Sequence, residues 1–238
     1  MGKKIKGCCY YCGKTPTSRE HLPPQQFFKG FTVDSLTVPS CKDHNNEKSH
    51  IDEAITKSML LPLEKKAIVK NDDIKLALEN VKPHYNQVKK ELSEQILYKH
   101  NNTNFDCIVL NPDIDLSDWI KKLSAGLIYY KTRFYDCMNN FDKSYVFERN
   151  SYVVHKTPHS LLDFENEYIK KVEFEKILEK GDWFDDWNDQ KNKYPETIYK
   201  FNYKFIGKLF VIRHWFFQQF KYYNIIKISD NTKEKIFK

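Results

Sequence analysis

The stretches that decide the fold of this chain are Cys9-Tyr-Tyr-Cys12 and Cys41-Lys-Asp-His44, near the start of a sequence of 238 residues. Each is a pair of soft ligands with two intervening residues, the spacing that lets both side chains reach one tetrahedral zinc ion. The segment between the pairs, residues 13–40, is too short for a core of its own and suits a hairpin and loop held by the metal. We therefore predict a structural zinc site formed by Cys9, Cys12, Cys41 and His44.

The predicted zinc site is closed, because four protein ligands leave no position for a catalytic water. The zinc would fold this segment and do no chemistry. Cys8 fits the site less well than Cys9, because three residues separate it from Cys12. Glu20-His21 and Asn45 are then the polar groups that remain, and we expect them to converge beside the rigid zinc-bound segment. A small metal-dependent hydrolase would be built in this way.

Four short motifs follow one another in the first fifth of the chain: Cys9 with Cys12, Glu20-His21-Leu-Pro-Pro24, Leu36-Thr-Val-Pro39-Ser-Cys41, and His44-Asn45-Asn46-Glu47-Lys48-Ser49. Together they resemble the HNH nuclease family, whose core is a ββα-metal finger. The resemblance covers residues 8 to 60 and does not extend to the rest of the chain. It implies an N-terminal nuclease finger with two strands, a helix and a structural zinc ion.

The resemblance also implies roles for single residues. His21 matches the general base of the family, which takes a proton from the attacking water, and its near-neutral pKa suits that task. Glu20 and Asn45 match the ligands of a catalytic Mg²⁺ or Mn²⁺ ion, which stabilises the charge on the leaving oxygen. Relatives usually have Asp at the place of Glu20 and Cys at the place of His44.

Other positions near the motif are weaker candidates. His50 is either an additional ligand or phosphate contact, or a solvated helix histidine. The family usually has an Asn before the second strand, and Asp34 is the substitute that we expect there. Arg19 and Lys48 are natural phosphate contacts.

The chain as a whole is expected to be α+β, with the finger at 1–62 and a mixed helical and β domain of unassigned role at 63–238. A further boundary is expected near 100–104, where His100-Asn-Asn-Thr-Asn104 reads as a loop. Ser117 is the expected N-cap of a long amphipathic helix. From periodicity, the expected helices are 45–59, 63–80, 85–99, 117–135 and 162–180, and the expected strands are 105–110, 145–155, 198–206, 209–217 and 222–228.

The net charge of +7 is concentrated at the two ends. Residues 198–238 carry nine Lys or Arg against two acids, interleaved with aromatic residues. Cations and aromatic rings together can hold phosphates and stack bases. We therefore predict nucleic-acid contacts there, although such alternation is also typical of a sheet with one buried face. The predicted contacts are Lys200, Lys204, Lys208 and Arg213.

The sequence contains no run of about 18 apolar residues, so we predict no membrane span. The N-terminus lacks the apolar region of a secretory signal. Six cysteines without such a signal indicate a metal site and free thiols. We expect a cytoplasmic protein.

The expected function is that of an HNH endonuclease, a hydrolase of phosphodiester bonds with DNA as the expected substrate and 5′-phosphate ends as products. By analogy with small HNH proteins, we expect an effector of bacterial antiphage defence or restriction, with a sensor or ATPase as a partner protein. One alternative is an RNA-cutting enzyme, since nothing in the finger reads the sugar. Another is a catalytically silent zinc module that binds nucleic acid or a partner protein.

Overall fold

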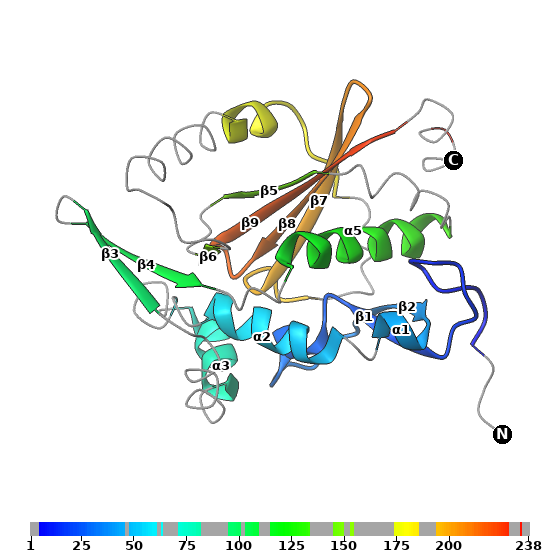
Figure 1. The fold of residues 1–238 in the computed structure, drawn as a ribbon, viewed down its shortest axis with the longest axis horizontal. Coiled ribbons are helices and arrows are strands. Elements are labelled where there is room, and N and C mark those ends of the chain that lie inside the picture. The colour runs from blue at the N-terminus through cyan, green and yellow to red at the C-terminus, as the bar shows by residue number, and fades with distance from the viewer. Residues whose placement is uncertain are drawn as a thin grey trace.

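The computed structural model of the chain (Figure 1) is a mixed α+β protein, as the sequence predicts. Two of the three sheets found in the described residues lie on either side of a long central helix. The structure describes residues 5–45, 48–60, 63, 71–81, 95–100, 103–109, 115–133, 145–149, 153–154, 174–185, 194–228 and 234.

The N-terminal part is a β-hairpin followed by two helices. Strand β1 (Ser18–Leu22) pairs with β2 (Leu36–Ser40) in antiparallel register, with Glu20 opposite Val38. A short 3₁₀ helix, η1 (Gln25–Phe28), lies between the strands. Helices α1 (Lys42–Asn45) and α2 (Lys48–Leu60) follow β2 directly.

The C-terminal part contains a four-stranded sheet with the strand order β5-β9-β8-β7. Its antiparallel strands are β5 (Tyr145–Arg149), β7 (Tyr199–Ile206), β8 (Leu209–Phe216) and β9 (Phe220–Lys227). Within one or two residues, β7, β8 and β9 match the strands predicted at 198–206, where aromatic and polar residues alternate, and at 209–217 and 222–228. One face carries the buried rings of Tyr199, Phe201, Phe210 and Phe216. The aromatic face is buried as that interpretation predicts, but the opposite face of β7 is not solvated throughout, because Asn202 and Lys204 are buried too.

Helix α5 (Leu116–Thr132) lies between this sheet and the N-terminal hairpin (Figure 1). Its N-cap is Asp115, whose side chain accepts a hydrogen bond from the backbone N–H of Asp118 at 2.9 Å. The prediction of Ser117 as N-cap was wrong, because Asp115 reaches the first free N–H groups of the helix from outside it. Gly126 lets α5 approach the hairpin, since a Cβ there would lie 2.7 Å from the methyl groups of Leu22.

Helix α3 (Asp72–Val81) agrees with the later half of the helix predicted at 63–80. The helix predicted at 85–99 was wrong over its last residues, because β3 (Gln95–His100) pairs with β4 (Thr103–Val109). Long-range pairing with β4 satisfies the backbone of β3, and helical spacing does not show such a partner. His100 pairs with Thr103 across this hairpin, so the ends of the predicted loop are strand residues, and 101–102 lie outside the described residues. A short parallel strand, β6 (Val153–Val154), completes that sheet.

One hydrophobic core joins the N-terminal and C-terminal parts. It includes Leu22 and Val38 of the hairpin, Ile55 of α2, Trp119 of α5 and Phe216 of β8. Tyr194 strengthens the junction, because its hydroxyl accepts from the backbone N–H of Leu36 at 2.8 Å and donates to the carbonyl of Leu22. The residues on both sides of 62 thus pack together, and the division into two domains stays a prediction. Among the described residues, no helix is long and apolar enough to cross a membrane.

Candidate metal centre

Four side chains converge beside the hairpin, and they are the four that the sequence predicts as zinc ligands: Cys9, Cys12, Cys41 and His44. One ligand atom from each lies within 4.8 Å of the others. The Cys41 Sγ lies 3.7 Å from the Cys12 Sγ and 3.1 Å from the His44 Nδ1. The Cys9 Sγ lies 3.8 Å from the same His44 nitrogen.

These distances fit a tetrahedral zinc ion. With Zn–S bonds of about 2.3 Å and a Zn–N bond of about 2.0 Å, two sulfur atoms lie about 3.8 Å apart, and sulfur and nitrogen about 3.5 Å apart. Three thiols and one imidazole also form a soft donor set that suits zinc. The cluster can therefore hold a metal ion such as zinc. Cys8 is not part of the cluster, and its side chain is hydrogen-bonded to Tyr129 instead.

Two tight turns bring the ligands of each pair together. The N–H of Gly13 donates to the carbonyl of Cys9 at 3.0 Å, and Gly13 has a φ of 72°, which a residue with a Cβ adopts less readily. On the other side, the N–H of His44 donates to the carbonyl of Cys41 at 3.2 Å as α1 begins. An ion pair of 3.0 Å between Lys14 and Asp43 connects the two turns.

The thiols have different acidities when no metal is bound. Burial raises the pKa of Cys9. Hydrogen bonds from the backbone N–H groups of Cys12, Cys41 and Tyr11 together lower it by more than burial raises it, so the net pKa is below the ordinary value. Desolvation, together with the neighbouring thiols of Cys9 and Cys41, raises the pKa of Cys12 to about 11. A metal must displace the proton of Cys12, so metal affinity should increase with pH.

The predicted catalytic residues Glu20 and His21 lie on opposite faces of β1. Glu20 is buried, and the hydroxyl of Tyr10 donates to its Oε1 at 3.1 Å. Burial and the Glu20 charge raise the pKa of Tyr10 well above its ordinary value, so Tyr10 stays a neutral donor. His21 is half-buried. Burial and the charge of Arg19 lower its pKa, so its imidazole is neutral at pH 7 and able to accept a proton.

Asn45 lies on the Glu20 side of the hairpin. Its side-chain amide donates to the Ser18 Oγ at 2.6 Å, and Ser18 precedes Glu20 by two residues on the same face of β1. The structure therefore places Asn45 and Glu20 on the same side of the strand. His50 is exposed on α2, and Asp34 is exposed before β2.

The cations that we predicted to contact nucleic acid have different surroundings. Arg19 is exposed and donates from Nε to the Thr37 Oγ1 at 2.8 Å. Lys200 pairs with Glu196 at 3.3 Å, and Lys208 lies in the exposed turn between β7 and β8. Lys204 and Arg213 are engaged inside the protein, as described below. The side chain of Lys48 lies outside the described residues.

Sequence reasoning missed a buried polar network beside the cluster. Tyr10 lies between Cys9 and Cys12 in the sequence, and its hydroxyl donates a hydrogen bond to Glu20. On α2, the buried carboxylate of Asp52 accepts from the Trp119 Nε1 at 2.7 Å. The position of Tyr10 within the Cys pair was a usable signal, whereas Asp52 and Trp119 are 67 residues apart and nothing local connects them.

A scan against protein-family models matches none, and searches of curated proteins and of solved structures find no match.

Proposed function

We propose that this chain is a metal-dependent nuclease of the HNH type that hydrolyses phosphodiester bonds in nucleic acid. The observation that carries the proposal is the Cys₃His cluster at the base of a β-hairpin followed by a helix. A structural zinc ion at this place would fix the hairpin against α1 and α2. Residues on the hairpin would then keep a constant position relative to the start of the helix.

In this proposal, His21 is the general base. Its imidazole is neutral at pH 7, as a base must be before it accepts a proton. The exposed guanidinium of Arg19 comes from the same face of β1 and would contact a phosphate. The positive charge of Arg19 favours an anionic substrate on this face of the hairpin.

Glu20 and Asn45 would hold a catalytic Mg²⁺ or Mn²⁺ ion. Both carry oxygen donors, which hard divalent cations prefer, and both lie on one side of β1. When bound, such an ion would stabilise the negative charge on the leaving oxygen. DNA is the proposed substrate, with RNA as the alternative that the assay distinguishes.

Cleavage of matched single-stranded and double-stranded DNA and RNA, with Mg²⁺ or Mn²⁺, tests the proposal. His21→Ala should reduce the rate by about 10²–10⁴-fold, the usual loss for a positioned base. Zinc content should be unchanged. The exposed Lys42, next to Cys41, provides a control, because Lys42→Ala changes a residue outside the proposed machinery. If His21→Ala cleaves at the wild-type rate, His21 is not the base.

A second candidate is a zinc module that binds nucleic acid or a partner protein without cleaving. It is favoured by one observation: Glu20 is buried, bonded to Tyr10, and on the opposite face of β1 from His21. Such a module would show no divalent-dependent cleavage of any substrate in the panel. A protein partner, such as a sensor or ATPase of a defence system, fits either candidate.

A further inference from the structure

The four-stranded sheet has a second face, opposite to the one that packs on α5. Its cations come from three neighbouring strands: Lys204 from β7, Arg213 from β8 and Lys221 from β9. The aromatic ring of Trp215 lies among them, with Arg213 at 5.9 Å and Lys221 at 5.0 Å from its centre. This face, which we call the cationic face, therefore combines positive charges with an aromatic surface.

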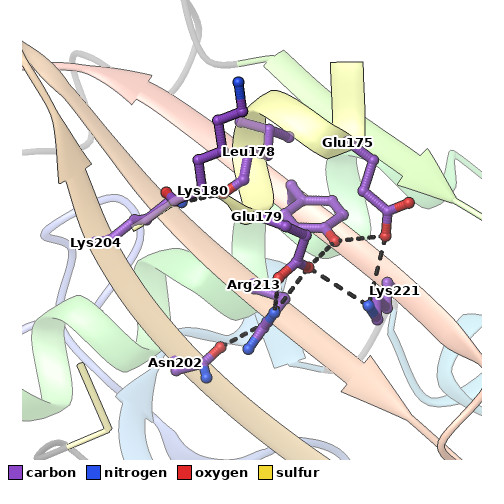
Figure 2. Close-up of polar contacts among 9 residues, drawn as sticks. Glu175, Leu178, Glu179, Lys180, Asn202, Lys204, Arg213 and Lys221 are labelled. Atoms are coloured by element: carbon purple, nitrogen blue, oxygen red, sulfur yellow. Dashed lines mark hydrogen bonds and ion pairs between the residues drawn. The ribbon is translucent and has the colours of Figure 1, made fainter. Parts of the chain in front are cut away.

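Residues 174–185 cover the cationic face (Figure 2). Their helix contributes Glu179, whose carboxylate binds both to Arg213 Nη1, at 2.7 and 2.6 Å, and to the hydroxyl of Tyr223 at 2.6 Å. Lys221 Nζ lies 3.5 Å from Glu175 and 3.4 Å from Glu179. The segment thus places two carboxylates on the cations of the sheet.

Lys204 is held by a different part of the same segment. Its ammonium group donates to the carbonyl oxygens of Leu178 and, at 2.7 Å, of Lys180, where the helix ends (Figure 2). The ring of Trp183 then lies over the cations, 4.4 Å from the Lys204 Nζ and 4.2 Å from the guanidinium of Arg213. Apart from Asn202 of β7, which accepts from Arg213 Nε at 2.8 Å, the hydrogen-bond acceptors of these three cations in the described residues belong to one short segment of the same chain.

The attachment of this cover has a small apolar part. Leu178 packs with Val211, Tyr223 and Ile225 in a cluster separate from the main core. Segments held by few buried apolar contacts are those that open at low free energy. The remaining attachment is polar, and the indole N–H groups of Trp183 and Trp215 are buried without a hydrogen-bond partner in the described part of the chain. An unsatisfied buried donor opposes the closed arrangement.

We propose that the cationic face is a binding surface for single-stranded nucleic acid, and that residues 174–185 occupy it as an internal substitute for that ligand. The carboxylates of Glu175 and Glu179 stand where phosphate groups would bind. Arginine and lysine form charge-assisted hydrogen bonds to phosphate oxygens, as Arg213 Nη1 does here to both carboxylate oxygens of Glu179. The nucleic acid would displace the segment, and its bases would stack on Trp215.

This proposal goes beyond the nuclease proposal and does not rest on cleavage. It also accounts for two of the cations predicted from the sequence, because Lys204 and Arg213 become available only when residues 174–185 leave. A single strand fits better than a duplex, since an aromatic ring on a sheet stacks with unpaired bases. The nucleic acid and residues 174–185 then compete for the same three cations, Lys204, Arg213 and Lys221.

The test compares two double variants of the same segment, with anisotropy of a labelled oligothymidylate about 15 nucleotides long, near the largest site of one single-strand-binding domain. No divalent ion is added, so cleavage does not interfere. Glu175→Gln with Glu179→Gln removes the charges that face the sheet. Asp182→Asn with Asp185→Asn is the matched control, because both aspartates are exposed and the change in net charge is the same.

The glutamine variant should bind at least about tenfold more tightly than wild type, which corresponds to about 1.4 kcal/mol. The slope of log K against log salt should steepen by about two, since each phosphate contact on a single strand contributes about 0.7. The asparagine control should bind like wild type. Adding Arg213→Gln to the glutamine variant should remove the gain. Circular dichroism and zinc content verify the fold, and Glu179→Gln alone replaces the double variant if that one folds poorly.

Three outcomes would overturn the proposal. Equal tightening in the glutamine and asparagine variants would mean that only net charge matters. No tightening in either, with the fold intact, would mean that residues 174–185 do not compete for this face. Binding of polyglutamate as tight as that of the oligonucleotide would mean a general anion site and not one for nucleic acid.

Discussion

Lowering the pH from 7 to 5 is expected to reduce the free energy of unfolding by about 2 kcal/mol through His214 alone. This side chain is fully buried on the α5-facing side of β8. Its Nε2 lies 2.8 Å from the Ser124 Oγ, and its Nδ1 lies 3.0 Å from the Tyr199 hydroxyl. Because Ser124 donates to the carbonyl of Ile120, His214 donates from Nε2 and accepts at Nδ1. The neutral imidazole therefore has both of its hydrogen bonds.

A second proton on His214 would have to bind Nδ1, and this nitrogen already accepts the hydrogen bond from the Tyr199 hydroxyl. Burial lowers the pKa of His214 from 6.5 to about 3. The folded pKa lies below the unfolded one, so this contribution to stability is fully present above about pH 6.5 and is lost as the pH falls toward 3. Between these values the loss approaches about 1.4 kcal/mol for each pH unit.

Urea unfolding over a series of pH values measures this effect. His214→Gln is the test variant, because an amide can replace a donor and an acceptor without titrating. Its stability should be lower at pH 7 but should fall by about 2 kcal/mol less than that of wild type between pH 7 and pH 5. His50→Gln, an exposed position, should keep the wild-type slope. Zinc content is measured at each pH, since a bound zinc ion would contribute folding free energy that is lost when the ion is released.

The result that would refute this reasoning is an equal pH dependence for wild type and His214→Gln, with zinc retained in both. His214 would then be protonated in the folded protein, and the hydrogen bonds to Ser124 and Tyr199 would not describe the protonation state in solution.

Two further predictions concern the N-terminal half. Elemental analysis should find one zinc ion per chain. Cys41→Ser should give metal-free protein without a cooperative unfolding transition, because metal binding here would contribute folding free energy. A folded wild-type protein without zinc would contradict this prediction. Trp119→Phe should lower the free energy of unfolding by about 1–3 kcal/mol, since it removes the donor at 2.7 Å from the buried carboxylate of Asp52; unchanged denaturant midpoints would show that this hydrogen bond contributes nothing net.

The metal centre could be predicted because its signal is local and doubled. Two pairs with the same spacing determine which four atoms converge, and the turns that bring each pair together involve residues next to the ligands, such as Gly13. Strand β7 could be predicted for a similar reason, because the alternation of Tyr199, Phe201 and Tyr203 with polar residues has the period of a strand and places these rings on one face, although the burial of Lys204 on the other face was not predicted. The same alternation along β8 places His214 on the buried face, a signal that was present and not used.

The remaining elements depend on partners that are far away in the sequence. Residues 95–99 have helical spacing, but the pairing of β3 with β4 makes them a strand. The relation of Glu20 to His21 is another case. The dipeptide predicts two neighbouring catalytic groups, whereas a strand turns successive side chains to opposite faces, and the packing of Tyr10 decides which of them is buried.

Lys204 and Arg213 show how a chemical interpretation of the sequence can be incomplete. Cations alternating with aromatic residues indicate an anion-binding surface, and the structure does place oxygen acceptors on these two side chains. The groups are its own, from the carbonyl of Leu178 and the carboxylate of Glu179, which are 26 and 34 residues distant in the sequence. A sequence reports which chemistry a strand can recognise but not whether the chain supplies that ligand itself. The competition between residues 174–185 and an oligonucleotide is therefore the measurement that relates the composition of this sheet to its function.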